Sequence, residues 1–183
     1  WAIASHLTDR PQTLPGPWEV AARIGQLAAS GELWFNAGMT LMRVGLSFAF
    51  AMALGMALGL VMGRSRAADD WLNPALIIGL NVPALVVIVL CYIWIGLNET
   101  AAIIAVALNK IPLVTVMIRE GARALRPDLD DMARAFRMAP MTRLRHVVLP
   151  QLAPQIAASA RAGISLIWKI VLVVEFLGRS NGV

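Results

Sequence analysis

Long apolar segments dominate this sequence and leave it few possible folds. Residues 36–63 are almost all apolar, and at about 1.5 Å per residue such a helix crosses a hydrocarbon core of about 30 Å. Hydrophobic residues make up 58% of the chain and charged residues 15%, a balance that soluble domains seldom have. We therefore predict an all-α, polytopic membrane protein, with spans at about 36–63, 71–97, 100–125 and 151–178.

The amino-terminal residues 1–35 are more polar than the membrane domain 36–183 that follows them. Residues 1–7 are interpreted as the end of a cut helix, and the proline-rich stretch after them as an outer loop. In 18–33, apolar residues recur at helical spacing between polar ones, which predicts a helix on the outer membrane surface or one packed on the protein itself. Because the chain starts at Trp1 and ends shortly after a span, we expect further helices at both ends.

Two of the spans carry features that bear on packing. Gly55, Gly59 and Gly63 recur every four residues, a spacing that lets two helices approach closely in lipid. The span 71–97 is interrupted by proline and by the step Asn81-Val82-Pro83. A broken helix in lipid needs protein or water to satisfy its free backbone groups, so this span is expected to border a pathway or a packed neighbour.

One interval, 119–150, is polar and holds seven of the sixteen Lys and Arg residues. The cations flank membrane spans, so the positive-inside rule places this interval in the cytoplasm and the net charge of +5 does not indicate nucleic acid. Asp128 is predicted to cap a short helix whose apolar face carries Leu129, Met132, Ala133 and Phe136. Pro140 suits the start of a second helix that ends near His146, and Pro150 and Pro154 predict a boundary before the last span.

The spacing within this interval resembles the cytoplasmic loop of the permease subunits of binding-protein-dependent ABC importers. That family's pattern is E-A-A, three residues, G, nine residues, I-x-L-P. Here Asp131-Met132-Ala133 match E-A-A and Val147-Val148-Leu149-Pro150 match I-x-L-P, while Arg137 stands where the family has glycine. Glycine there permits a left-handed turn after the first helix, so Arg137 departs from the pattern at a position that sets the backbone.

The resemblance implies a fold, partners and a coupling surface. The fold is the helical bundle of a type I ABC importer permease, in the inner (plasma) membrane of a bacterium. The implied partners are cytoplasmic ATP-binding subunits carrying ATP and Mg, a second copy of the permease, an external binding protein and the lipid bilayer. In that family the loop 126–150 contains a helix that fits a groove on the ATPase, which implies these coupling residues: Asp131, Met132, Ala133, Arg134, Ala135, Phe136, Arg137, Met138, Ala139 and Thr142. A solvated connector is the alternative.

Four ionisable residues inside the expected spans are the candidate substrate pathway: Arg43, Lys110, Lys169 and Glu175. Each costs several kcal/mol in lipid unless it is paired or hydrated, so a functional role is the first hypothesis. The three cations lie about nine or ten residues from the outer ends of their spans, which predicts a shared depth of about 14 Å. This excess of cations favours an anionic substrate. The alternative is a structural bridge from Arg43 or Lys169 to Glu175.

Two short segments extend the resemblance to the branch of the family that moves nitrate, sulfonates and taurine. These are Leu41-Met42-Arg43-Val44-Gly45 and Trp168-Lys169-Ile170-Val171-Leu172-Val173-Val174-Glu175. The resemblance therefore implies import of a small anion of this kind, delivered by the binding protein.

The sequence carries no motif for chemistry of its own. It has no Walker-type glycine loop, no His or Cys cluster at metal spacing and no nucleophile motif. His6, His146 and the single cysteine, Cys91, are isolated. The chain is therefore predicted not to be an enzyme and to bind no metal or cofactor itself. A secondary transporter or channel that uses its intramembrane charges without an ATPase is one alternative, and a non-transporting scaffold is another.

Overall fold

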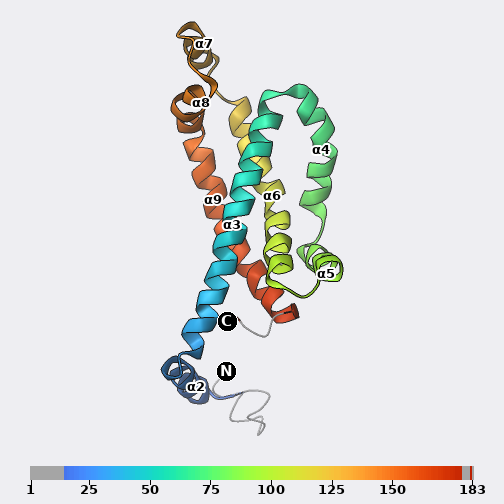
Figure 1. The fold of residues 1–183 in the computed structure, drawn as a ribbon, viewed down its shortest axis with the longest axis vertical. Helices are drawn as coiled ribbons and strands as arrows, with labels where there is room; N and C mark the ends of the chain where they lie inside the picture. Colours follow the sequence, from blue (N-terminus) through green and yellow to red (C-terminus); the bar gives the residue numbers. More distant parts are fainter. Residues whose placement is uncertain (1–14, 179–181, 183) are drawn as a thin grey trace.

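The chain folds into a bundle of helices, and the computed structural model describes residues 15–178 and 182 (Figure 1). The interpretation of 1–7 as the end of a helix lies outside the described residues. The helices are α2 (Pro17–Ala29), α3 (Glu32–Arg64), α4 (Arg66–Asn81), α5 (Ala84–Ile95), α6 (Glu99–Arg123), α7 (Pro127–Ala135), α8 (Pro140–Arg143) and α9 (Leu149–Gly178). A π-helical turn, Leu144–Val148, joins α8 to α9. The described residues form no strand, which confirms the all-α prediction.

Helix α6 lies at the centre of the bundle, with α3 and α9 along its length and α4 and α5 on its other side (Figure 1). Two apolar clusters follow one another along α6. The outer cluster, on the side of α2, consists of Val44, Ile88, Cys91, Ala102, Ala105, Val106, Ile167, Val171 and Val174. The inner cluster, on the side of α7, consists of Val114, Ile118, Val148 and Leu152.

Glycines bring α3 and α6 into backbone contact, as their spacing predicts. A Cβ atom on Gly55 would lie 2.6 Å from Cβ of Val114, and one on Gly59 would lie 2.7 Å from the carbonyl oxygen of Thr115. One on Gly63 would lie 2.5 Å from Cβ of Ala122. Real Cβ atoms do not come this close to other atoms, so the crossing of α3 over α6 needs residues without a side chain.

Helices α4 and α5 are bent by 100° relative to each other, where the sequence predicts one interrupted span. The bend is at the step predicted to break it, because Val82 is extended and Pro83 cannot donate the backbone hydrogen bond that would continue α4. A Cβ atom on Gly79 of α4 would lie 2.8 Å from the ring of Pro112 on α6. The broken element therefore borders a packed neighbour.

Among the described residues, three helices are long and apolar enough to cross a membrane, and a fourth crossing is present if α4 and α5 are one span. The first span begins at Glu32 and not at 36, and the second element begins at Arg66 and not at 71. The third helix, Glu99–Arg123, agrees closely with the predicted 100–125. Asn98 caps it, because its side-chain oxygen accepts a hydrogen bond from the amide of Ala101 at 2.8 Å.

The boundary predicted at Pro150 and Pro154 is wrong, because α8, the π-helical turn and α9 form one helix of 39 residues, Pro140–Gly178. In the π-helical turn the amide of Leu149 bonds to the carbonyl of Leu144, five residues back. This wider turn comes directly before Pro150 and makes room for a ring that would clash with a regular preceding turn.

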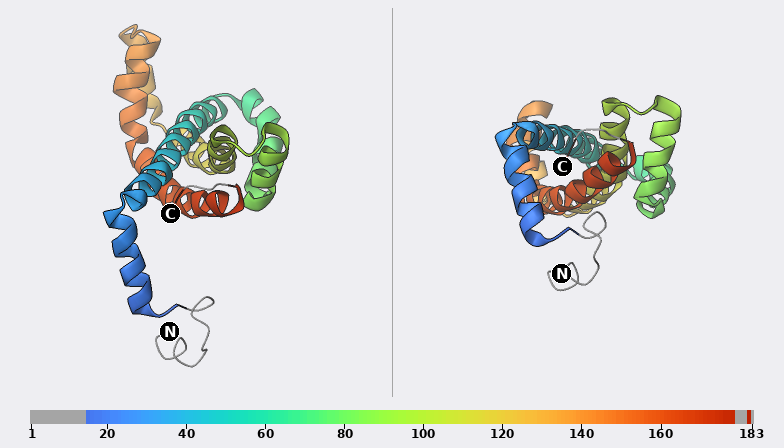
Figure 2. Two further views of the ribbon diagram at one scale, coloured as in Figure 1. Left: turned by 60° about the horizontal axis from the view of Figure 1, so that its bottom comes forward. Right: turned by 90° about the horizontal axis from the view of Figure 1, so that it is seen from below.

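Helix α2 lies at the outer end of the bundle and turns away from the axis of α3 (Figure 2). None of its residues is buried, so of the two sequence interpretations, packing on the protein itself is the one that the structure does not support. Trp18 is 85% exposed and Ile24 50% exposed. An amphipathic helix with its aromatic and aliphatic side chains uncovered suits the headgroup layer of a bilayer.

Replacing Gly59 with leucine should destabilise the bundle by about 1–3 kcal/mol, because the added side chain meets the backbone of α6. The measurement is the unfolding midpoint of the detergent-solubilised protein. Gly45→Leu is the matched control, since a Cβ atom there meets nothing within 4 Å. Equal midpoints for the two variants would contradict the glycine-dependent crossing.

Candidate functional site

The loop 126–150 projects beyond the inner ends of α3, α4 and α6 and carries α7 and α8 (Figure 1). Helix α7 starts at Pro127, with Arg126 as its cap residue, so the prediction of Asp128 as cap is wrong. Proline suits the first helical position because its fixed φ is already helical and it has no amide to leave unbonded. Asp128 lies one residue further on and pairs with Arg126 at 2.5 Å.

Asp130 fastens this loop to the rest of the protein. Its carboxylate accepts hydrogen bonds from Nε of Arg143 at 2.7 Å, from Arg64 at 3.3 Å and from Arg134 at 3.3 Å. Arg64 is the last residue of α3 and Arg143 the last of α8, so one side chain joins three elements. The hydrogen bond from Arg143, with the charges of Arg64 and Arg134, lowers the pKa of Asp130 and keeps it ionised at neutral pH.

Sequence reasoning missed Asp130 because the family motif directs attention to the next residue, Asp131. Asp131 is exposed and has no ion pair within the described residues. The available signal was the spacing of Asp130 and Arg134, which places them on one side of a helix at i and i+4. The partners Arg64 and Arg143 come from distant turns of the fold, which no local spacing shows.

Arg137 takes the backbone conformation that the family's glycine would take. Its φ is +49°, and it is the one non-glycine residue with a positive φ in the described part of the chain. The amide of Met138 bonds to the carbonyl of Ala133 at 3.0 Å, and the amide of Arg137 to that of Arg134 at 2.9 Å. These two bonds are the pair that closes a helix in a Schellman motif. The left-handed turn is therefore kept without glycine, at a cost of about 1–2 kcal/mol.

The loop presents an apolar tip to its surroundings. Phe136 is 75% exposed, Met141 72% and Met132 38%, whereas Ala133 is buried. The predicted apolar face of α7 therefore divides, with Ala133 against the protein and Phe136 turned out. Of the proposed coupling residues, Ala133 is buried, Met138 is half-buried, and the others are exposed: Asp131, Met132, Arg134, Ala135, Phe136, Arg137, Ala139 and Thr142.

A second group of charges lies at the outer end of the bundle, where α3, α6 and α9 meet. Arg43 is 1% exposed and donates two hydrogen bonds to Glu99, at 2.7 and 2.8 Å, and one to Glu175, at 2.5 Å. The hydroxyl of Thr40 donates to the same carboxylate of Glu175 at 2.8 Å. The structural bridge between Arg43 and Glu175 is thus present, and Glu99, at the start of α6, adds a second carboxylate.

The three intramembrane cations do not share a depth, which corrects the sequence prediction. Arg43 contacts Glu99, the first residue of α6, whereas Lys110 lies 11 residues further along the same helix, or about 16 Å. Lys110 is 7% exposed, and Lys169 is exposed on α9. Counting residues inward from the outer ends of the expected spans gave the wrong depths for two reasons. Arg43 packs against the end of α6, and α3 begins before the predicted span.

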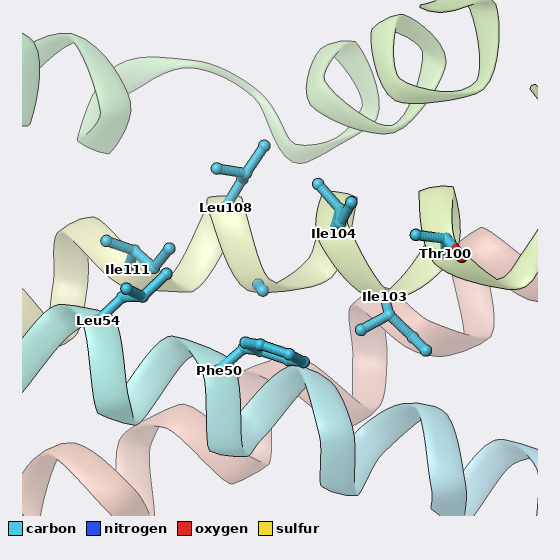
Figure 3. Close-up of a pocket in the computed structure, with 8 residues that line it drawn as sticks. Phe50, Leu54, Thr100, Ile103, Ile104, Leu108 and Ile111 are labelled. Atoms are coloured by element: carbon cyan, nitrogen blue, oxygen red, sulfur yellow. The ribbon is translucent and has the colours of Figure 1, made fainter. Parts of the chain in front are cut away.

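An apolar cavity of about 420 Å³ lies between α3 and α6 (Figure 3). It is lined by Phe50, Leu54, Thr100, Ile103, Ile104, Ala107, Leu108 and Ile111. Ala107 and Ile111 precede and follow Lys110 on α6, but Lys110 itself does not line the cavity. Its walls offer almost no polar partner, so it is unsuited to holding an anion.

Apolar helices long enough to span a bilayer, with a pair of short helices projecting on one side, define a multi-pass membrane protein with a projecting loop. Residues 51–183 match the family described as binding-protein-dependent transport system inner membrane component, and the chain belongs to that family. It is a permease subunit of an ABC importer in the inner membrane, and such subunits are not themselves enzymes. This decides against the secondary transporter and the channel.

Individual relatives agree with this assignment. The aliphatic sulfonates transport permease protein SsuC of Escherichia coli K12 is 32% identical over 186 residues, which cover 100% of this chain and 70% of that protein. The taurine transport system permease protein TauC of the same organism is 24% identical and is covered to 68%. A crystal structure of an amino acid ABC transporter with histidines shares the fold, with a TM-score of 0.64 at 22% identity over 85% of this chain and 76% of that one.

Replacing Arg43 with methionine should destabilise the protein by about 3–5 kcal/mol, because two buried or half-buried carboxylates lose their common partner. The unfolding midpoint in detergent measures this. Glu99→Gln is the milder control, since the pair between Arg43 and Glu175 remains. A midpoint for Arg43→Met equal to that of the wild type would show that the cluster does not hold the outer end together.

Replacing Arg137 with glycine should stabilise the end of α7 by about 1 kcal/mol, because glycine adopts a positive φ without strain. Hydrogen exchange of the Met138 amide, which bonds to Ala133, should become slower. Arg137→Val should have the opposite effect, since a β-branched residue is strained there. Faster exchange in the glycine variant would show that the arginine side chain itself holds the turn.

Proposed function

We propose that this permease moves a small anion, such as nitrate, a sulfonate or taurine, and that cytoplasmic ATPase subunits drive it by docking on α7 and α8. The observation that carries the proposal is the exposed apolar tip of the loop, with Phe136 at its centre and arginines around it. An exposed aromatic anchor on a clamped turn suits a groove on a partner protein. ATP and Mg would be bound and consumed by that partner, not by this chain.

The contacts of Asp130 give a route for force. A push on α7 reaches α3 through Arg64 and α8 through Arg143, and α8 continues into α9. Two membrane-crossing helices are therefore moved from one docking point. This supports a rigid-body change of the bundle, of the kind that alternately opens a pathway to each side.

The remaining partners follow from the family. A binding protein outside the cell would deliver the solute, and a second copy of the permease would complete the pathway. The names of the relatives refer to aliphatic sulfonates and taurine, which carry an anionic sulfonate group. Of the predicted pathway residues, Arg43 and Glu175 are paired with each other, so Lys110 and Lys169 are the cations that we propose for the pathway.

Replacing Phe136 with aspartate should uncouple transport from ATP hydrolysis, because a charge at the tip cannot enter an apolar groove. We expect co-purification of the ATPase and binding-protein-stimulated hydrolysis to fall by at least about tenfold, the effect of losing an interface anchor. Phe136→Leu, which keeps the apolar contact, is the control. Normal co-purification and stimulated hydrolysis in Phe136→Asp would contradict docking at this tip.

A further inference from the structure

Lys110 is the buried charge for which the described residues provide no partner. The buried polar or charged side chains of the described residues are Thr40, Arg43, Ser47, Lys110, Thr115, Ser159 and Glu175. Six of these donate or accept a hydrogen bond within the structure. Lys110 has neither a hydrogen bond nor an ion pair with any described residue, although it is 7% exposed.

The position of Lys110 separates the two apolar clusters. Val106, one turn before it on α6, belongs to the outer cluster, and Val114, one turn after it, belongs to the inner cluster. Both valines are at most 1% exposed. At i−4 and i+4 they share a helix face with Lys110. The lysine therefore lies on the inward face of α6, between the residues that α6 contributes to the two clusters.

Arg43 is an example of a buried cation with a structural role, and its surroundings differ from those of Lys110. Arg43 is buried more deeply, and two carboxylates surround it. A structural charge in lipid is paired in this way because an unpaired one costs several kcal/mol. No carboxylate in the described part of the chain pairs with Lys110, so the hydration that its charge loses on burial lowers the stability of the empty protein and requires another reason.

We infer that the ammonium group of Lys110 is the contact for the transported anion within the membrane, an inference that rests on the proposed anion import. The anion would supply the counter-charge that no described residue provides. A small oxyanion fits this role, since it can accept hydrogen bonds from the ammonium while its charge is screened from the apolar clusters on either side. The site would be electrically neutral when loaded and costly when empty, which favours anions over neutral solutes.

The inference makes two linked predictions for Lys110→Met. Uptake should fall by at least about 30-fold, as expected when one partner of a buried charge pair is lost. The unfolding midpoint of the substrate-free complex should rise, because methionine fills a similar volume without an unpaired charge. A lysine with a structural partner would give the reverse, a lower midpoint.

The experiment uses the complete complex of permease, ATPase and binding protein in proteoliposomes, with labelled taurine, ethanesulfonate, nitrate and bicarbonate as probes. Lys110→Arg, which keeps the charge, should retain transport of the probe that the wild type imports. Arg161→Met removes a cation from an exposed position on α9 and serves as the control, with uptake close to that of the wild type. ATP hydrolysis in the absence of the binding protein should be unchanged in all variants.

The outcomes separate the two proposals. Wild-type import of a probe together with undiminished import by Lys110→Met would overturn the assignment of Lys110 and leave the importer proposal standing. A Lys110→Met complex that unfolds at a lower temperature, or does not assemble, would show that Lys110 has a partner inside the assembly, which also overturns it. A wild-type complex that imports none of the four probes would remove the anion proposal, and with it the inference.

Discussion

The contact between α3 and α6 is the constraint on which the rest of the structure depends. In lipid there is no hydrophobic drive to bring two apolar helices together, so close packing of their backbones supplies the attraction. Gly55, Gly59 and Gly63 provide it over the inner half of α3. With this pair fixed, α9 and the bent pair of α4 and α5 pack on the remaining faces of α6.

Ion pairs then join the helices at both ends, where water or headgroups meet the bundle. At the inner end Asp69 of α4 pairs with Arg119 and Arg123 of α6, while Asp130 holds the loop. At the outer end Arg43 holds α6 and α9. Between these ends the buried hydroxyls of Ser47, Thr115 and Ser159 each donate a hydrogen bond to a nearby backbone carbonyl oxygen. The polar groups of the bundle are thus placed according to depth.

The sequence was sufficient for the features that arise from local periodicity. The number and rough limits of the apolar segments, the glycine contact, the break at Pro83 and the polar loop all follow from spacing along the chain. For Arg43, the sequence left open a substrate-pathway role and a structural bridge to Glu175. The ion pair between Arg43 and Glu99 was not predicted, because it depends on where α3 meets the end of α6. The carboxylate of Asp130 was missed for a similar reason.

Other errors arose from rules that the surrounding structure overrides. Proline usually ends a helix, but the π-helical turn before Pro150 accommodates it, and no feature of the sequence announces such a turn. Arginine is rare at positive φ, yet Arg137 adopts it, because the chain must reverse after α7 to bring Arg143 to Asp130. In both cases the geometry of the loop determines the local backbone.

The unbroken helix from Pro140 to Gly178 has a mechanical consequence. It carries Arg143 near one end and Glu175 near the other, joined by a helical path of about 48 Å at about 1.5 Å per residue that includes the π-helical turn and Pro154. A rod of this length acts as a lever arm, in which a tilt of about 5° at the cytoplasmic end displaces the far end by about 4 Å. Such a swing would exceed the reach of a hydrogen bond. Under the proposed docking on α7 and α8, a small rotation imposed from inside the cell would therefore part Glu175 from Arg43 at the opposite face of the membrane.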